Sequence, residues 1–359
     1  PLNNKYSTNV VDICPVGALT DRDFRFKKRV WYLRSKESVC SGCARGCNMQ
    51  IHYSNERLHH ANGERVIRLK PRYNEHVNQW WMCDEGRYNY RFHDHNRIDY
   101  CLKRSGKEVR QTTTPEMLSE IARKVEQAQG RVAVLVSPQL SNEDLYVTKR
   151  LFEGELKVSR LHLISPNKPG FQDDFLIRAD KNPNSKGAEF LGFRYDEKAL
   201  AGLFKELDQG MIKGVFIFGQ DLLALYPDAV KALAKVEWTV FMGPNHNLMS
   251  ENSTYVLPAA THAEEDGTFT NFEGRVQRFN RALYASGDAQ PEWKILSGLG
   301  KDLGTAVVFD NVEQVFQEMV LREKPFEGLE FDKLKTGGSD IRVFAAPTLP
   351  DLQKYQGTL

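Results

Sequence analysis

The middle of the chain alternates between short apolar runs and longer amphipathic stretches. Residues 132–136 form a continuous apolar run, rich in β-branched side chains, that ends before Pro138 and predicts a buried strand. After Thr114-Pro115, apolar residues recur at helical spacing until Gly130, where a helix is expected to end. The same patterns predict strands at 160–165, 213–218, 237–242 and 254–258, and helices at 142–154, 197–208 and 223–235. Apolar strands separated by amphipathic helices are typical of a parallel sheet covered on both faces. We therefore expect a doubly wound, mostly parallel α/β domain over residues 105–305.

The residues on either side of this domain follow other patterns. Residues 49–53 and 65–69 alternate apolar with polar side chains, and Asn62-Gly63 between them is typical of a tight turn. This alternation predicts a small strand-and-loop module over residues 28–104. Residues 306–359 are expected to form an extended C-terminal tail that carries one helix near residues 311–321.

Four cysteines of the small module have a spacing typical of metal ligands. Cys40, Cys43 and Cys47 lie close together, and Cys83 follows after a long gap. Three neighbouring thiolates and one distant thiolate suit the corners of a [4Fe–4S] cluster. A structural zinc site is the alternative, although its ligands usually come as two short pairs. The spacing favours a [4Fe–4S] cluster held by all four cysteines on the loops beside the short strands.

A fifth cysteine, Cys14, is followed by Pro15. Cys-Pro closes ferredoxin-type ligand runs, in which the last cysteine often serves a different cluster from its neighbours. Residues 1–13 contain no cysteine, and the sequence begins with Pro rather than Met. The spacing alone leaves two interpretations open. Cys14 is either a cluster ligand whose partners are missing or a buried, unreactive thiol.

The composition excludes several functional classes. The chain has 359 residues with a net charge of +2, which is too small to indicate nucleic acid as a partner. No apolar stretch approaches the roughly 20 residues that cross a bilayer, so we expect no direct membrane insertion. Bunched cysteines without a disulfide-type framework favour a reducing compartment. The first predicted strand is not followed by G-x-G-x-x-G, and no P-loop occurs, so the usual nucleotide-binding signatures are missing.

Three segments of the chain resemble one superfamily. Residues 40–47 together with residues 81–87 resemble the cluster domain that opens molybdopterin oxidoreductases, and residues 257–277 resemble a late segment of the same superfamily. Residues 12–19 resemble one group within it more closely. That group is the large iron–sulfur subunits of the peripheral arm of bacterial NADH:quinone oxidoreductase (respiratory complex I).

This resemblance implies an electron-transfer and scaffold subunit of an enzyme complex, without a substrate site of its own. It implies that Cys40, Cys43, Cys47 and Cys83 hold a [4Fe–4S] cluster that lies off the main electron path. It also favours Cys14 as a ligand of a second [4Fe–4S] cluster, with residues 1–27 as the remnant of an upstream ferredoxin-like cluster domain. The implied partners are the flavin-bearing and quinone-facing subunits of the arm. The implied location is cytoplasmic, at the inner face of the cell membrane and attached through those subunits.

Two other functions remain as alternatives. The first is a molybdopterin-dependent oxidoreductase, such as a formate dehydrogenase, and the second is a zinc-stabilised interaction module. Catalytic molybdopterin enzymes usually carry a lysine two residues beyond the fourth cysteine, where this chain has Glu85. No cysteine follows Cys101, which excludes a thiolate ligand to the metal from the large domain. We therefore expect no molybdopterin.

Overall fold

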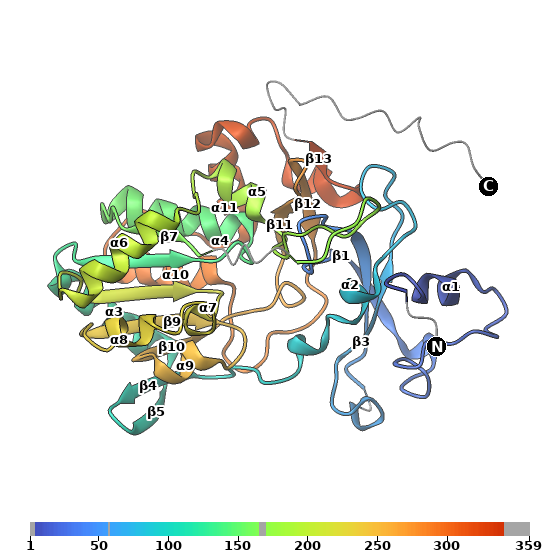
Figure 1. Cartoon of the computed structure of the whole chain (residues 1–359), viewed down its shortest axis with the longest axis horizontal. Helices are drawn as coiled ribbons and strands as arrows, with labels where there is room; N and C mark the ends of the chain where they lie inside the picture. Colours follow the sequence, from blue (N-terminus) through green and yellow to red (C-terminus); the bar gives the residue numbers. More distant parts are fainter. Residues whose placement is uncertain (1–3, 57, 165–169, 341–359) are drawn as a thin grey trace.

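The computed structural model describes residues 4–56, 58–164 and 170–340 of the chain. A small sheet near the N-terminus and a large sheet with surrounding helices lie at opposite ends of the molecule, and a third sheet lies between them (Figure 1).

The small sheet consists of three antiparallel strands in the order β1 (Arg34–Val39), β2 (Asn48–Tyr53) and β3 (Val66–Pro71). Alternate side chains such as Met49 and Ile51 are buried on its inner face, as the sequence pattern predicts. Helix α2 (Asp84–Tyr88) packs against β3. Helix α1 (Thr8–Ile13) is tied to the same strand by an ion pair between Asp12 and Lys70, with 3.0 Å between Oδ1 and Nζ.

The large sheet has seven strands in the order β5-β4-β10-β9-β8-β6-β7. Its five parallel strands are β6 (Val132–Val136), β7 (Leu161–Leu163), β8 (Gly214–Phe218), β9 (Trp238–Gly243) and β10 (Tyr255–Pro258). At one edge, β4 (Cys101–Ser105) and β5 (Glu108–Thr112) form an antiparallel hairpin. The domain boundary expected between residues 104 and 105 lies inside this hairpin. Because β4 pairs with β10 and β5, it belongs to the large sheet. The predicted doubly wound, mostly parallel α/β fold is confirmed.

Side chains of the parallel strands alternate between two apolar cores, one on each face of the large sheet. Val134 of β6 lies in the first core, whereas Ala133 and Leu135 lie in the second. The first core is covered by α3 (Thr114–Ala128), α4 (Asn142–Thr148), α10 (Glu292–Asp302) and α11 (Val312–Arg322). The second is covered by α6 (Glu197–Asp208), α7 (Leu222–Leu225), α8 (Ala229–Leu233) and α9 (Leu248–Asn252). Because both faces are buried, the strand sequences have no regular polar positions.

Two helices differ from the sequence prediction. The helix expected over residues 223–235 is divided into α7 and α8, and Pro227 lies between them. Proline has no N–H group to continue the hydrogen-bond ladder of a helix. The helix expected over residues 142–154 changes after α4 into a π-helical turn at Lys149–Glu155.

The third sheet joins the two parts. It consists of β11 (Gly267–Thr270), β12 (Arg275–Phe279) and β13 (Ser339–Asp340) in antiparallel order. Val39, the last residue of β1, is buried against Phe269 of β11 and Phe279 of β12. The late segment identified in the sequence therefore supports the end of the small sheet.

Residues 306–340 do not form the extended tail expected from the sequence. Phe316 of α11, Phe326 and Phe331 are buried in the first core of the large sheet. The prediction is wrong for this segment because its spaced aromatic side chains contribute to the core. The expected helix near residues 311–321 is present as α11, and residues 341–359 lie outside the described part of the chain.

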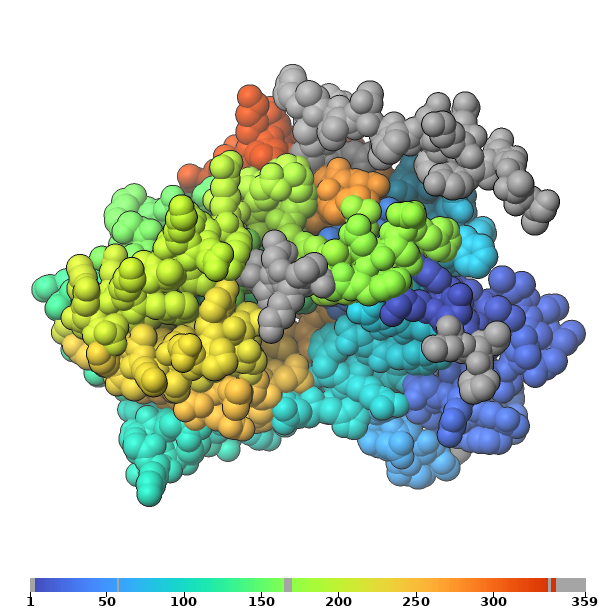
Figure 2. All heavy atoms as spheres, viewed as in Figure 1, coloured from blue at the N-terminus to red at the C-terminus, as the bar shows by residue number. Residues whose placement is uncertain are grey.

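The segment that follows residue 170 connects the large sheet with the N-terminal part. The backbone N–H of Ala44 donates to the carbonyl oxygen of Asp180 over 2.9 Å, and the Tyr6 hydroxyl donates to Asp173. Figure 2 shows this bright green segment lying against the blue N-terminal residues. Within the described residues, no helix has the length and apolar character needed to cross a membrane.

Candidate metal centre

The fold brings the four predicted cluster ligands to one place. Cys40, Cys43 and Cys47 lie on the loop between β1 and β2, and Cys83 immediately precedes α2. The loop is closed by a hydrogen bond of 2.8 Å from the N–H of Cys40 to the carbonyl oxygen of Cys47. All four side chains line one small, buried cavity, together with the apolar side chains of Met82, Leu176 and Ile177.

Two glycines let the backbone approach the sulfur atoms closely. The N–H of Gly42 lies 3.5 Å from Cys40 Sγ, and the N–H of Gly86 donates to Cys83 Sγ over 3.3 Å. A Cβ atom added at Gly86 would lie 2.9 Å from Cys40 Sγ and 3.5 Å from Cys83 Sγ. Backbone N–H groups directed at sulfur stabilise thiolate ligands and tune the potential of a bound cluster. The backbone is therefore arranged for ligation.

Burial also controls the protonation of these thiols. Burial, followed by repulsion from the neighbouring cysteines, raises the pKa of Cys40 and of Cys47 well above the ordinary value. Burial raises the pKa of Cys83 to about 11, although the Gly86 N–H acts in the opposite direction. Thiolate is the form that binds metal, so such a set becomes ionised when a positively charged centre compensates the burial.

The spacing of the sulfur atoms is wide for a single ion. In the described parts of the chain, no three of these cysteine sulfurs lie within 4.8 Å of one another. Tetrahedral zinc bonds of about 2.3 Å would place the sulfurs roughly 4 Å apart. The four residues thus fit a larger inorganic centre such as a [4Fe–4S] cluster, and their role as its ligands stays a prediction.

The late segment of the chain supports the cysteine loop directly. Gln277 of β12 donates from its side-chain nitrogen to the carbonyl oxygen of Gly46 over 2.9 Å, and the N–H of Phe272 donates to Ala44 over 2.9 Å. Gln277 is fully buried, and Gly46 has a positive φ of 63° that favours glycine. Residues 267–277 therefore help to hold the loop of Cys40, Cys43 and Cys47 in shape.

Cys14 lies apart from the other four cysteines. It follows α1, is partly exposed and does not line the cavity of the four cysteines. The backbone N–H groups of Leu19 and Val16, followed by those of Ala18 and Gly17, lower the pKa of Cys14. Because Cys14 is partly exposed, it is not a buried thiol, and its role as a cluster ligand stays a prediction.

The segment that carries Cys14 is anchored beside Cys83. The side-chain amide of Asn9 in α1 donates to the carbonyl oxygen of Met82 over 2.9 Å, and its oxygen accepts from the N–H of Met82 over 3.2 Å. Arg87 of α2 forms an ion pair with Asp12, with 2.7 Å between Nη1 and Oδ2. The two cysteine sites are therefore mechanically connected through the short helices α1 and α2.

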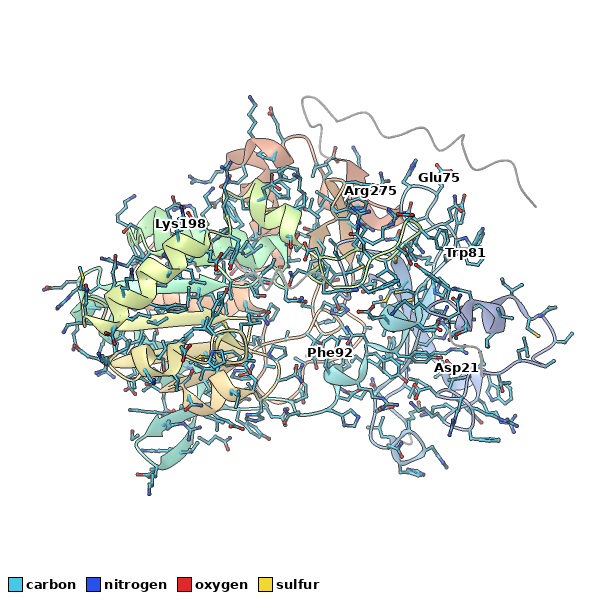
Figure 3. The ribbon with its side chains drawn as sticks, viewed as in Figure 1. Asp21, Glu75, Trp81, Phe92, Lys198 and Arg275 are labelled. Carbon is cyan, nitrogen blue, oxygen red and sulfur yellow. The ribbon has the colours of Figure 1, made fainter. Side chains whose placement is uncertain are left out.

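A larger cavity of about 700 Å³ lies next to the cysteine site. Gly42, Glu85 and Lys181 line both cavities, and Glu85 pairs with Lys181 over 3.2 Å. Phe92, labelled between the two parts of the molecule in Figure 3, lies on its wall. The cavity also contains three buried carboxyl groups from Asp144, Glu265 and Glu292, which the sequence patterns do not identify. They come from distant segments, and no local spacing relates them.

Comparisons with known proteins agree with this architecture. Residues 33–95 match the model of the molybdopterin oxidoreductase Fe4S4 domain, and residues 182–302 match the molybdopterin oxidoreductase model. The chain is 28% identical over 261 residues to the G-type subunit of the NADH-quinone oxidoreductase of Streptomyces coelicolor. The chain is a homologue of these G-type subunits. The family resemblance found in the sequence is thereby confirmed.

Other relatives of this kind show the same relationship at different coverage. The G-type subunit of the Rickettsia felis NADH-quinone oxidoreductase is 30% identical over 42% of this chain. The 75 kDa subunit of the Reclinomonas americana NADH-ubiquinone oxidoreductase is 21% identical over 87% of this chain. The chain spans 30% of the Streptomyces protein, 22% of the Rickettsia protein and 63% of the Reclinomonas protein.

Among solved structures, acetylene hydratase from Pelobacter acetylenicus has the same fold. Its TM-score is 0.54 with 12% identity, covering 84% of this chain and 74% of that one.

Proposed function

We propose that this chain is an electron-transfer and scaffold subunit of the peripheral arm of an NADH:quinone oxidoreductase. In this proposal Cys40, Cys43, Cys47 and Cys83 hold a [4Fe–4S] cluster, and the chain has no substrate site of its own. The observation that carries the proposal is the meeting of four buried cysteines in one cavity with N–H groups directed at two of the sulfurs. A bound cluster supplies one-electron transfer, and the protein supplies ligands, a dry environment and placement.

The surroundings of the four sulfurs suit such a role. Met82, Leu176 and Ile177 are buried on the cavity wall and keep the local dielectric low. Burial and N–H donors are two of the factors that set the potential of an iron–sulfur cluster. The cluster would therefore have a fixed environment that the third sheet keeps rigid through the cysteine loop.

The charge of the large cavity disfavours the molybdopterin alternative. Carboxyl groups of Asp144, Glu265, Glu292 and Glu85 line the space beside the cysteine site. Molybdopterin is anionic, and these acidic side chains offer its phosphate groups no positive charge, while the lysine on the same wall, Lys181, already pairs with Glu85. The zinc alternative is disfavoured by the wide spacing of the sulfur atoms.

The proposal extends to partners and to Cys14. We place the chain against flavin-bearing and quinone-facing subunits, at the inner face of the cell membrane and attached through them. Cys14 would be a ligand of a second [4Fe–4S] cluster, because residues 12–19 resemble the ligand segment of the family and the thiol is partly exposed. Its further ligands are not among residues 1–13.

Metal analysis of single cysteine variants tests the main assignment. The chain is purified without oxygen, and iron, sulfide, zinc and molybdenum are measured for the wild type, Cys83→Ser and Cys101→Ser. Cys101 is a fully buried thiol in β4 near Thr114, so its variant controls for the loss of a buried sulfur. We expect about four irons and four sulfides per chain in the wild type and in Cys101→Ser, with a strong loss in Cys83→Ser. One zinc per chain, or an iron content that does not change in Cys83→Ser, would contradict the proposal.

A further inference from the structure

Three carboxyl groups from distant parts of the chain meet inside the large cavity. Asp144 belongs to α4, Glu265 lies in the loop before β11, and Glu292 is the first residue of α10. One oxygen atom from each carboxyl group lies within 4.8 Å of the other two. All three residues are buried, and all three line the cavity.

The positive charge of Arg97 acts on Glu292, but no cation pairs directly with the cluster among the residues that the structure describes. None of the three carboxyl groups takes part in an ion pair there. The nearby Arg97 pairs with Glu264 instead, at 2.6 Å between Nη2 and Oε2. Glu265 Oε2 is buried without a hydrogen-bond partner. Burial, followed by repulsion from Asp144, raises the pKa of Glu265 and of Glu292 well above the ordinary value. A cluster of this kind is stable when it takes up either protons or a cation.

A histidine in the same cavity independently indicates a polar ligand. His262 is 8% exposed, its ring lines the cavity, and its Nε2 atom has no hydrogen-bond partner. Burial lowers the pKa of His262 to about 4, so the ring is neutral at physiological pH. A buried, neutral imidazole nitrogen without a partner is a group whose missing hydrogen bond a bound water can supply.

We propose that Asp144, Glu265 and Glu292 bind one hard divalent cation, such as Mg²⁺, Mn²⁺ or Ca²⁺. Carboxylate oxygens together with water are the ligands that these cations prefer, whereas soft metals select the cysteine site. The cavity of about 700 Å³ leaves room for waters that complete the coordination shell. His262 would hydrogen-bond to one of these waters.

The Asp144 carboxylate is already held in place for this task. Its Oδ1 atom accepts a hydrogen bond of 2.8 Å from the N–H of Trp293, and its Oδ2 atom accepts one of 3.1 Å from the N–H of Ser141. These bonds connect α4 with the beginning of α10. A cation at this point would also attach the loop before β11, which leads into the sheet that supports the cysteine loop. The site would therefore stabilise the large domain, and it does not require an iron–sulfur cluster.

Manganese binding to the cluster-containing chain tests the proposal. Chelator-treated protein is titrated with Mn²⁺ near neutral pH, and free Mn²⁺ is measured by its EPR signal. We expect one Mn²⁺ per wild-type chain, displaced by Mg²⁺ or Ca²⁺. Glu265→Gln and Glu292→Gln should each weaken binding at least tenfold. Glu251→Gln, which changes an exposed carboxyl group of α9, serves as the matched control and should leave the affinity unchanged.

Thermal unfolding of the same proteins distinguishes a loss of metal binding from a folding defect in a variant. Mn²⁺ should raise the Tm of the wild type and of Glu251→Gln but not that of Glu265→Gln. Without metal, Glu265→Gln should unfold at the wild-type temperature or above it, because the substitution removes a buried repulsion. His262→Gln retains the three carboxylates and should weaken binding only a few-fold. Absence of stoichiometric Mn²⁺ binding to the wild type, or an equal Mn²⁺-dependent Tm increase in Glu265→Gln, would overturn the proposal.

Discussion

Replacement of Gly86 by alanine is a sensitive probe of the cysteine site. Gly86 lies in α2 with an ordinary helical backbone, so alanine fits its conformation. The new Cβ atom, however, would lie 2.9 Å from Cys40 Sγ, a distance that side-chain carbon atoms do not tolerate. Gly86→Ala therefore forces the sulfur of Cys40 away from the backbone of α2, whereas the 3.5 Å to Cys83 Sγ is an ordinary contact.

The size of the effect follows from two opposing contributions. Alanine is favoured over glycine inside a helix by about 1 kcal/mol. Overpacking of a filled interior costs about 1–3 kcal/mol. The net change should be a loss of up to about 2 kcal/mol in the free energy of unfolding of the cluster-containing protein. Gly202→Ala in α6 is the matched control, because a Cβ atom there meets nothing within 4 Å and the helix gain remains.

Iron content and denaturant unfolding, measured anaerobically, provide the assay. We expect Gly86→Ala to hold clearly less iron than the wild type and to unfold at lower denaturant concentration. Gly202→Ala should hold the full amount of iron and be slightly stabilised. If Gly86→Ala binds four irons, gives the wild-type EPR spectrum after reduction and is stabilised like Gly202→Ala, the reasoning about sulfur packing is refuted.

Three further predictions concern other parts of the account. Gln277→Ala removes the hydrogen bond to the Gly46 carbonyl, which should lower the free energy of unfolding by about 1–3 kcal/mol. The cluster should also be lost faster in air, as measured by the decay of its absorbance. In cluster-free protein near pH 7.5, iodoacetamide should alkylate Cys14 before Cys83, because the pKa of Cys14 is lowered while that of Cys83 is raised to about 11. Mass spectrometry identifies the modified residue. Early labelling of Cys83 would contradict the burial argument. Burial raises the pKa of Glu143 to about 7, so this group contributes stability that is complete below its unfolded pKa near 4.5 and disappears as the pH rises through 7. Glu143→Gln should therefore have a higher free energy of unfolding than the wild type at pH 8, by up to about 3 kcal/mol, because each pKa unit is worth about 1.4 kcal/mol. At pH 4 this advantage should be absent. Equal differences at both pH values in urea unfolding would disprove the prediction.

Much of the fold could be predicted because its local signals agree with its tertiary structure. The apolar run at residues 132–136 corresponds to β6, and the helix expected at residues 197–208 corresponds to α6. The uninterrupted apolar run of β6 and the helical spacing of apolar residues in α6 are the patterns that burial in the two cores requires, so the sequence pattern and the packing agree. The four cysteines also meet as their spacing predicts, because local structure brings them together. The β1–β2 loop is short, and Cys83 begins a helix beside β3.

Features that depend on distant contacts could not be predicted. Residues 306–340 bury aromatic side chains in the core of a sheet that ends about fifty residues earlier in the sequence, at β10. The hydrogen bond from Gln277 to Gly46 and the cluster of Asp144, Glu265 and Glu292 combine residues from separate segments. A single sequence contains no periodicity that relates such positions, so they appear only when the chain is folded.

The most direct test of the cluster assignment is a crystal structure of the anaerobically purified chain with anomalous diffraction data collected at the iron absorption edge. We expect anomalous density for four irons in the cavity enclosed by the sulfur atoms of Cys40, Cys43, Cys47 and Cys83. A single metal peak at the zinc edge in that cavity, or iron density located away from these four sulfurs, would contradict the assignment.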